Sequence, residues 1–186
     1  AQLLAQQKNL LALKSAVDTI NTDNVQLLAL SEQIAALALQ SGATARDVAA
    51  TSRVALLTQR IAKNANALRG GDAIDPEIAF LLGKDTNALR EQIAALANLR
   101  GDAELQARIT ELGGAAKGSF DAVAEILGNI QLLVQAKQAG ARIFRDAGPL
   151  LAHSKELAGS LADAYRGFDL LTLAILASAL LALAVL

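Results

Sequence analysis

Hydrophobic residues recur every seven positions over the first forty residues of the chain. Two adjoining heptad series are present, Leu13, Ile20, Leu27 and Ile34 in the first and Leu3, Leu10 and Val17 in the second. A repeat of this length is typical of helices that pack in left-handed bundles or coiled coils. The second series continues with Asn24 and Ser31, polar residues that fix the register of a bundle at a cost in stability. We therefore expect one long helix that ends near Leu39.

Turn-forming and capping residues predict where the following helices begin and end. The expected boundaries are, in chain order, a turn at Ser41-Gly42, an N-cap at Thr44, a second helix from about Ala45 to Leu68, a third helix from Asp75-Pro76, a turn at Gly101-Asp102 and the end of a fourth helix near Gly128-Asn129. Gly83 is expected to break the third helix into a short and a longer piece. The fourth helix contains Gly113, Gly114 and Gly118, which weaken it or let a neighbouring helix approach closely.

The last helix is predicted to begin near Gln131 and to run without a loop to the end of the sequence. Its heptad series consists of Ile143, Leu150, Leu157 and Ala164. Gly148-Pro149 should kink this helix or start a new one, because proline lacks the backbone donor of a helix interior. The exposed apolar series predicts self-association as a parallel homodimer along this helix.

Residues 168–186 form the most apolar stretch of the chain, with Asp169 as their single charge. About 20 apolar residues in a helix cross the roughly 30 Å hydrocarbon core of a bilayer. We therefore expect two parts, a helical module over 1–167 and a transmembrane helix over 168–186. The predicted fold is all-α, an antiparallel helical bundle with heptad packing whose last long helix continues into the transmembrane helix.

Composition excludes several classes of function. The 186 residues include 17 basic and 18 acidic side chains, and this near-neutral balance does not indicate nucleic-acid binding. The chain has no cysteine, which excludes thiol catalysis and zinc clusters. Its single histidine, His153, leaves almost no room for a histidine metal site or a Ser/His/Asp catalytic set. No catalytic set is present, and we expect a protein without enzymatic activity, cofactor or metal.

One stretch of the second helix combines two arginines with the apolar face. Arg53, Leu57, Arg60 and Asn64 follow one another at intervals of four, three and four residues, which places them in one stripe. Guanidinium groups beside an apolar face suit the recognition of carboxylates or other oxyanions. The predicted ligand or partner site consists of Arg53, Gln59, Arg60, Lys63 and Asn64. The structural alternative is that Arg60 only stabilises the bundle, by pairing with an acid such as Glu91, Asp121 or Glu125.

The same stretch carries a family resemblance. The segments 57–65 (LTQRIAKNA), 71–77 (GDAIDPE) and 80–85 (FLLGKD) are similar to the type IV pilus methyl-accepting chemotaxis proteins of the PilJ type. The resemblance covers about residue 26 to the end and includes the position of a helical sensor segment directly before a transmembrane helix. The chain would correspond to the membrane-proximal sensory module and exit helix of such a receptor.

The resemblance implies a periplasmic module in a receptor of the bacterial inner membrane, in contact with membrane lipid. Receptors of this family are dimers that control a CheA-type kinase, together with a CheW-type protein, and through it twitching motility. Those kinase contacts would lie in parts of the receptor that this sequence does not contain. The sequence does not name the stimulus, which could be a small molecule, a pilin or mechanical load, and no nucleic acid is implied.

Two other interpretations remain open from the sequence. Nitrate/nitrite sensor histidine kinases have a related arginine-bearing helix, so the chain could be the sensor domain of such a kinase. A membrane-anchored coiled coil with a purely structural role is the third interpretation. It requires only the heptads and the apolar tail.

Overall fold

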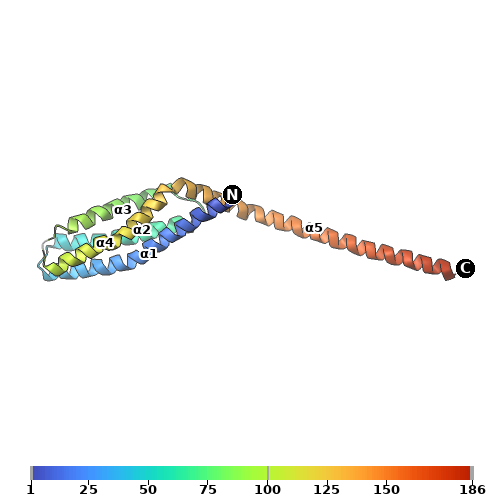
Figure 1. The fold of residues 1–186 in the computed structure, drawn as a ribbon, viewed down its shortest axis with the longest axis horizontal. Coiled ribbons are helices and arrows are strands. Elements are labelled where there is room, and N and C mark those ends of the chain that lie inside the picture. The colour runs from blue at the N-terminus through green and yellow to red at the C-terminus, as the bar shows by residue number, and fades with distance from the viewer. Residues whose placement is uncertain (1, 100, 185–186) are drawn as a thin grey trace. The chain divides into compact units, whose positions relative to one another are not determined.

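The computed structural model describes residues 2–99 and 101–184, and the side chains of residues 7–99, 101–165 and 171–181. These residues form the helices α1 (Gln2–Gln40), α2 (Ala45–Gly70), α3 (Pro76–Leu96), α4 (Ala103–Gly128) and α5 (Ile130–Ala184), with no strand among them. In the bundle, α1 packs against α2 and α4, and α3 packs against the same two helices (Figure 1). The predicted all-α class and the packing of the helices against one another are confirmed.

The heptad series of α1 forms one side of the bundle core. Leu13, Ile20, Leu27 and Ile34 are all buried, as is Val17 of the second series. Ser31 is also buried, and its hydroxyl donates to the carbonyl oxygen of Leu27 at 2.7 Å. The heptad prediction is therefore confirmed for these positions.

Leu10 of the second α1 series differs from the prediction. Leu10 is 36% exposed, so its assignment to the core was wrong. A straight helix drifts by about 20° per heptad relative to a strict seven-residue repeat, which moves Leu10 to the edge of the buried face. The side chain of Leu3 lies outside the described residues.

Capping side chains start three helices of the bundle, and the predicted N-cap Thr44 is one of them. The Thr44 side chain accepts from the backbone N–H of Asp47, whose carboxylate accepts from the backbone N–H of Thr44, and this reciprocal capping box starts α2. Asp75 caps α3, with Pro76 in its first turn, and Asp102 caps α4. These side chains satisfy amide groups that have no partner inside a helix.

The expected break at Gly83 is absent, and no new helix begins at Pro149. Helix α3 passes through Gly83 unbroken, so the prediction of two shorter helices was wrong. A Cβ at this position would lie 3.2 Å from Leu127 Cδ1, which indicates that the glycine allows α3 and α4 to approach closely. Pro149 lies inside α5 and does not begin a new helix there.

The chain divides into two compact units, Ala1–Ala139 and Gly140–Leu186. The first unit comprises α1 to α4 and the first turns of α5, where Leu133 and Ala136 are buried. In the second unit every described side chain is exposed. This division concerns packing, and the predicted module boundary at residue 167 stays a prediction.

Within the described residues, no helix has the length and apolarity needed to cross a membrane. Residues 185 and 186 of the expected span 168–186 lie outside the described residues, as do the side chains of 168–170 and 182–184. The transmembrane assignment of this segment stays a prediction.

The glycines of α4 allow a direct test of the packing. Gly114 is exposed, with nothing within 4 Å of a Cβ, so Gly114→Ala should raise the free energy of unfolding by about 0.5–1 kcal/mol. A Cβ on Gly118 would lie 2.6 Å from Asp23 Oδ2, which accepts a hydrogen bond from the Ser119 hydroxyl at 2.9 Å. Gly118→Ala should therefore raise the free energy of unfolding less than Gly114→Ala does. Urea denaturation followed by circular dichroism measures both, and an equal gain at the two positions would contradict the packing.

Candidate functional site

The five predicted site residues lie on the middle turns of α2. Arg53, Gln59, Arg60 and Lys63 are exposed, and Asn64 is half-buried. On the inner face of the same turns, Val54, Leu57 and Ile61 are buried in the bundle core. This apolar face fixes the rotation of α2, so the polar residues beside it are held at the border between core and solvent.

Two of the five residues meet a buried acid on α3. Arg60 Nη2 lies 2.8 Å from Asp85 Oδ1, and Asn64 Nδ2 donates to Asp85 Oδ2 at 3.4 Å. The Asp85 side chain is 3% exposed, whereas that of Arg60 is 46% exposed. The guanidinium therefore neutralises a desolvated carboxylate on one side and keeps part of its surface in solvent.

The structure supports pairing of Arg60 inside the bundle but corrects the expected partner. The prediction named Glu91, Asp121 or Glu125, and the acid in contact is Asp85. These three acids are exposed. Asp85 instead lies on the inward face of α3, where helical spacing from Leu82 and Leu89 places it. That spacing was readable in the sequence and would have identified a charged residue at a core position.

The other three predicted residues do not join this cluster. No hydrogen bond or ion pair connects Arg53, Gln59 or Lys63 with another described residue. Their side chains are free to meet a ligand or a partner protein from solvent. The arrangement thus has a fixed part, formed by Arg60, Asn64 and Asp85, and a solvent-facing part on α2.

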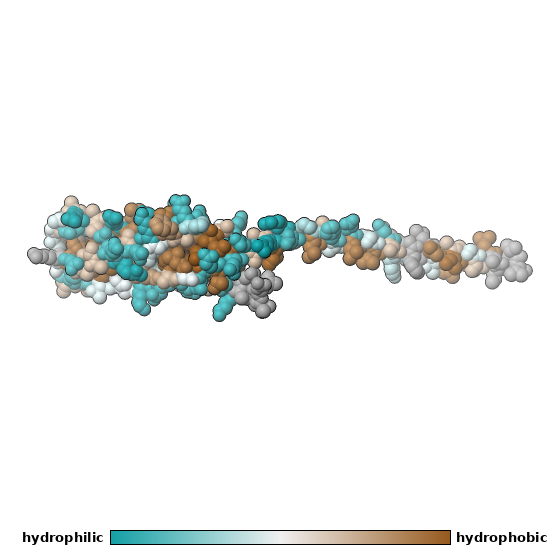
Figure 2. Space-filling view, turned by 90° about the horizontal axis from the view of Figure 1, so that it is seen from above, coloured by the Kyte–Doolittle hydropathy of each residue, from teal (hydrophilic) through white to brown (hydrophobic). Residues whose placement is uncertain are grey.

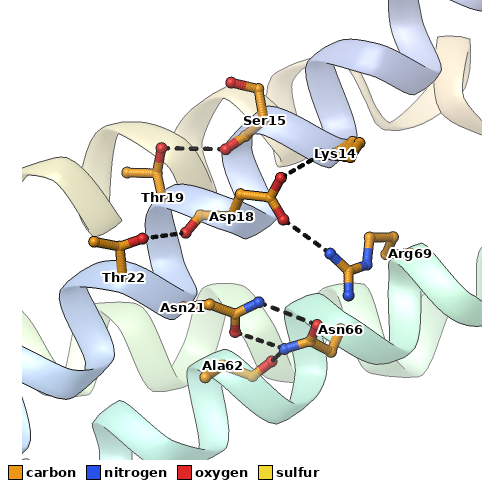
Figure 3. A network of polar contacts seen from close by, with 9 residues as sticks. All are labelled: Lys14, Ser15, Asp18, Thr19, Asn21, Thr22, Ala62, Asn66 and Arg69. Carbon is orange, nitrogen blue, oxygen red and sulfur yellow. Dashed lines mark hydrogen bonds and ion pairs between the residues drawn. The ribbon is translucent and has the colours of Figure 1, made fainter.

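A second polar network joins α1 to the C-terminal half of α2 (Figure 3). Asp18 of α1 accepts from Lys14 at 2.6 Å and from Arg69 at 2.9 Å. One turn further along α1, the amides of Asn21 and Asn66 donate to each other at 3.2 and 2.7 Å. Because paired amides meet in only one register, this network fixes how α1 and α2 are aligned.

Asp18 should make the stability of the bundle depend on acid pH. The hydrogen bond from Lys14, with the charges of Lys14 and Arg69, lowers the pKa of Asp18 below 3.8, although partial burial opposes this. Because the pKa of Asp18 is lower in the folded than in the unfolded state, the interactions of its carboxylate stabilise the fold above pH 3.8. This stabilisation is lost as the pH falls through the pKa of Asp18 in the folded state. Thermal unfolding between pH 6 and pH 2 should therefore show a weaker acid dependence in Asp18→Asn than in the wild type. Parallel curves for the two proteins would contradict the role given to Asp18.

The described residues contain no group of three or more histidine, aspartate or glutamate side chains placed to hold a metal ion. His153 lies on the exposed surface of α5, with Nδ1 3.6 Å from Glu156 Oε2. Among the described residues, the polar cluster around Asp85 has a defined geometry, an ion pair and a hydrogen bond that join α2 to α3.

Comparison with known proteins adds no family to this description. No protein-family model and no curated protein matches the chain.

Proposed function

We propose that the chain is the sensory module of a transmembrane chemoreceptor of the PilJ type, which controls type IV pilus-based twitching motility through a CheA-type kinase. One observation carries the proposal. The resemblance rests on separate segments of sequence, and two of them, 57–65 and 80–85, meet at the contact of Arg60 and Asn64 with Asp85. We take residues that come together in space as stronger support for the resemblance than the same residues dispersed over a surface.

The chemistry of this cluster suits a sensor. A buried ion pair adds little net stability compared with apolar packing, but breaking it is costly. In this proposal the two helices have two arrangements, paired and unpaired, and a ligand that binds one of them better shifts the population. An anionic ligand that engaged the exposed side of Arg60 would compete with Asp85 for the guanidinium.

The proposed ligand or partner site consists of Arg53, Gln59, Arg60, Lys63 and Asn64. The three cationic side chains among them expose donors along one side of α2, and this favours an anionic small molecule or an acidic surface of a pilin. In the proposal, residues 168–186 anchor the chain in the bacterial inner membrane and the bundle lies in the periplasm.

The proposed receptor is a homodimer along α5. Ile143, Leu150 and Leu157 of the predicted heptad series are 54%, 74% and 65% exposed. Hydrophobic side chains (brown) lie along exposed α5 in Figure 2. A regular apolar series of this kind on a single helix is the sequence pattern of a two-stranded coiled coil.

The dimer can be tested by disulfide crosslinking, because these 186 residues contain no cysteine. Leu157→Cys should crosslink efficiently under mild oxidation in membranes. Ala152→Cys is the matched control, since helical geometry places Ala152 on the opposite face of α5. Equal crosslinking at both positions, or none at Leu157→Cys, would refute the proposed dimer.

The function itself is tested by deleting the gene in the source organism and measuring surface twitching and CheA phosphorylation. Loss of both, restored by the wild-type gene, is the expected result. Normal twitching and unchanged kinase phosphorylation would refute the proposal. A nitrate-dependent phosphorylation of a histidine in the protein's own cytoplasmic part would favour the sensor kinase instead, and a defect only in envelope integrity would favour the structural coiled coil.

A further inference from the structure

The C-terminal turn of α2 is a junction between three helices of the first unit. The Arg69 side chain reaches α1, where it lies 2.9 Å from Asp18 Oδ1. The carbonyl oxygen of the same residue accepts from Lys137 Nζ of α5 at 2.8 Å, and the Gly71 carbonyl oxygen also accepts from this ammonium group. The end of α2 therefore contacts α1 through the Arg69 side chain and contacts α5 through backbone carbonyl groups.

Lys137 is well suited to this contact. The last carbonyl groups of a helix have no partner within the helix and carry partial negative charge, so they attract a cation. Leu133 and Ala136, which precede Lys137 on the same face of α5, are buried, so packing presses the lysine against the end of α2. Burial lowers the pKa of Lys137, and the charge of Asp72 partly opposes this.

Lys137 lies near the point where α5 leaves the first unit. Lys137 lies two residues before the first unit ends at Ala139. Helix α5 continues as one helix from Ile130 to Ala184. Its rotation about its own axis in the first turns is fixed by the buried face and by this one ammonium group.

We propose that Lys137 is a positioning residue that clamps the first turns of α5 to the C-terminal turn of α2, so that a displacement of α2 reaches α5 through its ammonium group. Arg60 and Asn64, which contact Asp85, lie on the same helix α2 as this turn. The clamp would thus connect the proposed sensory cluster with the helix that leads toward the membrane. The signalling part of this inference rests on the proposed function, whereas the clamp itself rests on the contacts.

The clamp is tested by hydrogen exchange on the full chain in detergent micelles, with Lys137→Met as the main variant. Methionine keeps the apolar stem and removes the ammonium group. We expect exchange about fivefold faster in 69–74 and in 130–139, with the core of α1 unchanged. Lys137→Arg keeps a cationic donor, so its exchange rates should remain near those of the wild type. Lys155→Met, on the exposed part of α5, should exchange at the wild-type rates.

Wild-type exchange in Lys137→Met, or uniformly faster exchange over α1 to α4, would overturn the clamp. The signalling part is tested on the complete receptor with its kinase. Lys137→Met should shift the basal kinase activity at least twofold, whereas Lys155→Met should not. Faster local exchange with unchanged kinase activity would overturn the signalling role. If the wild-type receptor has no effect on the kinase, the proposed function is refuted. The clamp would then be judged by the hydrogen-exchange measurement alone.

Discussion

Replacement of Arg60 by Gln is expected to lower the free energy of unfolding by about 2 kcal/mol, because it leaves the buried Asp85 carboxylate without its cation. A fully buried pair would lose about 3–5 kcal/mol on removal of one partner. The expected loss for Arg60→Gln is smaller, because nearly half of the Arg60 side chain is exposed and water can reach the space that it leaves. Denaturation in urea, followed by circular dichroism at 222 nm, measures the loss.

A double-mutant cycle separates this effect from a general loss of packing. Asp85→Asn replaces the carboxylate with a neutral group of similar shape, which costs less to bury, so we expect a loss of about 1 kcal/mol or less. Arg60→Gln combined with Asp85→Asn should then be more stable than Arg60→Gln alone, since no unpaired charge remains in the core. Additive losses in the double variant would contradict a coupled pair.

Leu112→Ala should lower the free energy of unfolding more than Arg60→Gln does. Leu112 of α4 is fully buried, so removal of its branched end leaves a cavity. The surrounding helices are closely packed and can fill this cavity only in part. Substitutions of this type cost about 2–5 kcal/mol. The same urea denaturation gives the loss, with the denaturant dependence expected to stay constant.

Leu56→Ala is the matched control for this cavity. Leu56 of α2 is 54% exposed, and its truncation should change the free energy of unfolding by about 0.5 kcal/mol or less. Equal losses at Leu56 and Leu112 would mean that the bundle core is placed wrongly.

Local patterns were sufficient to predict most of the fold. The capping box at Thr44 and the Asp75-Pro76 start depend on neighbours within a few residues, so they are readable without tertiary information. Gly83 was misread for the opposite reason. The reason for a glycine there is the space between α3 and α4, where a Cβ would lie 3.2 Å from Leu127 Cδ1, and Leu127 is distant in sequence.

The candidate site was predictable only in part. The stripe on α2 followed from helical spacing, but the partner of Arg60 depends on how α3 is rotated and on how far it slides along α2. Asp85 occupies a position where the heptad pattern expects an apolar residue, and such exceptions to the pattern are where functional or register-setting residues are expected. The junction at Lys137 left no sequence signal, because it joins a backbone carbonyl to a residue 68 positions away.

The most direct test of the proposed role is the autophosphorylation rate of the CheA-type kinase in membranes that contain the complete receptor. The rate should depend on the receptor, and Arg60→Gln should change it at least twofold at a temperature where the bundle stays folded. Leu56→Ala should leave it at the wild-type value. A kinase rate that is the same with the wild-type receptor, with Arg60→Gln and with no receptor would contradict a sensory function for this chain.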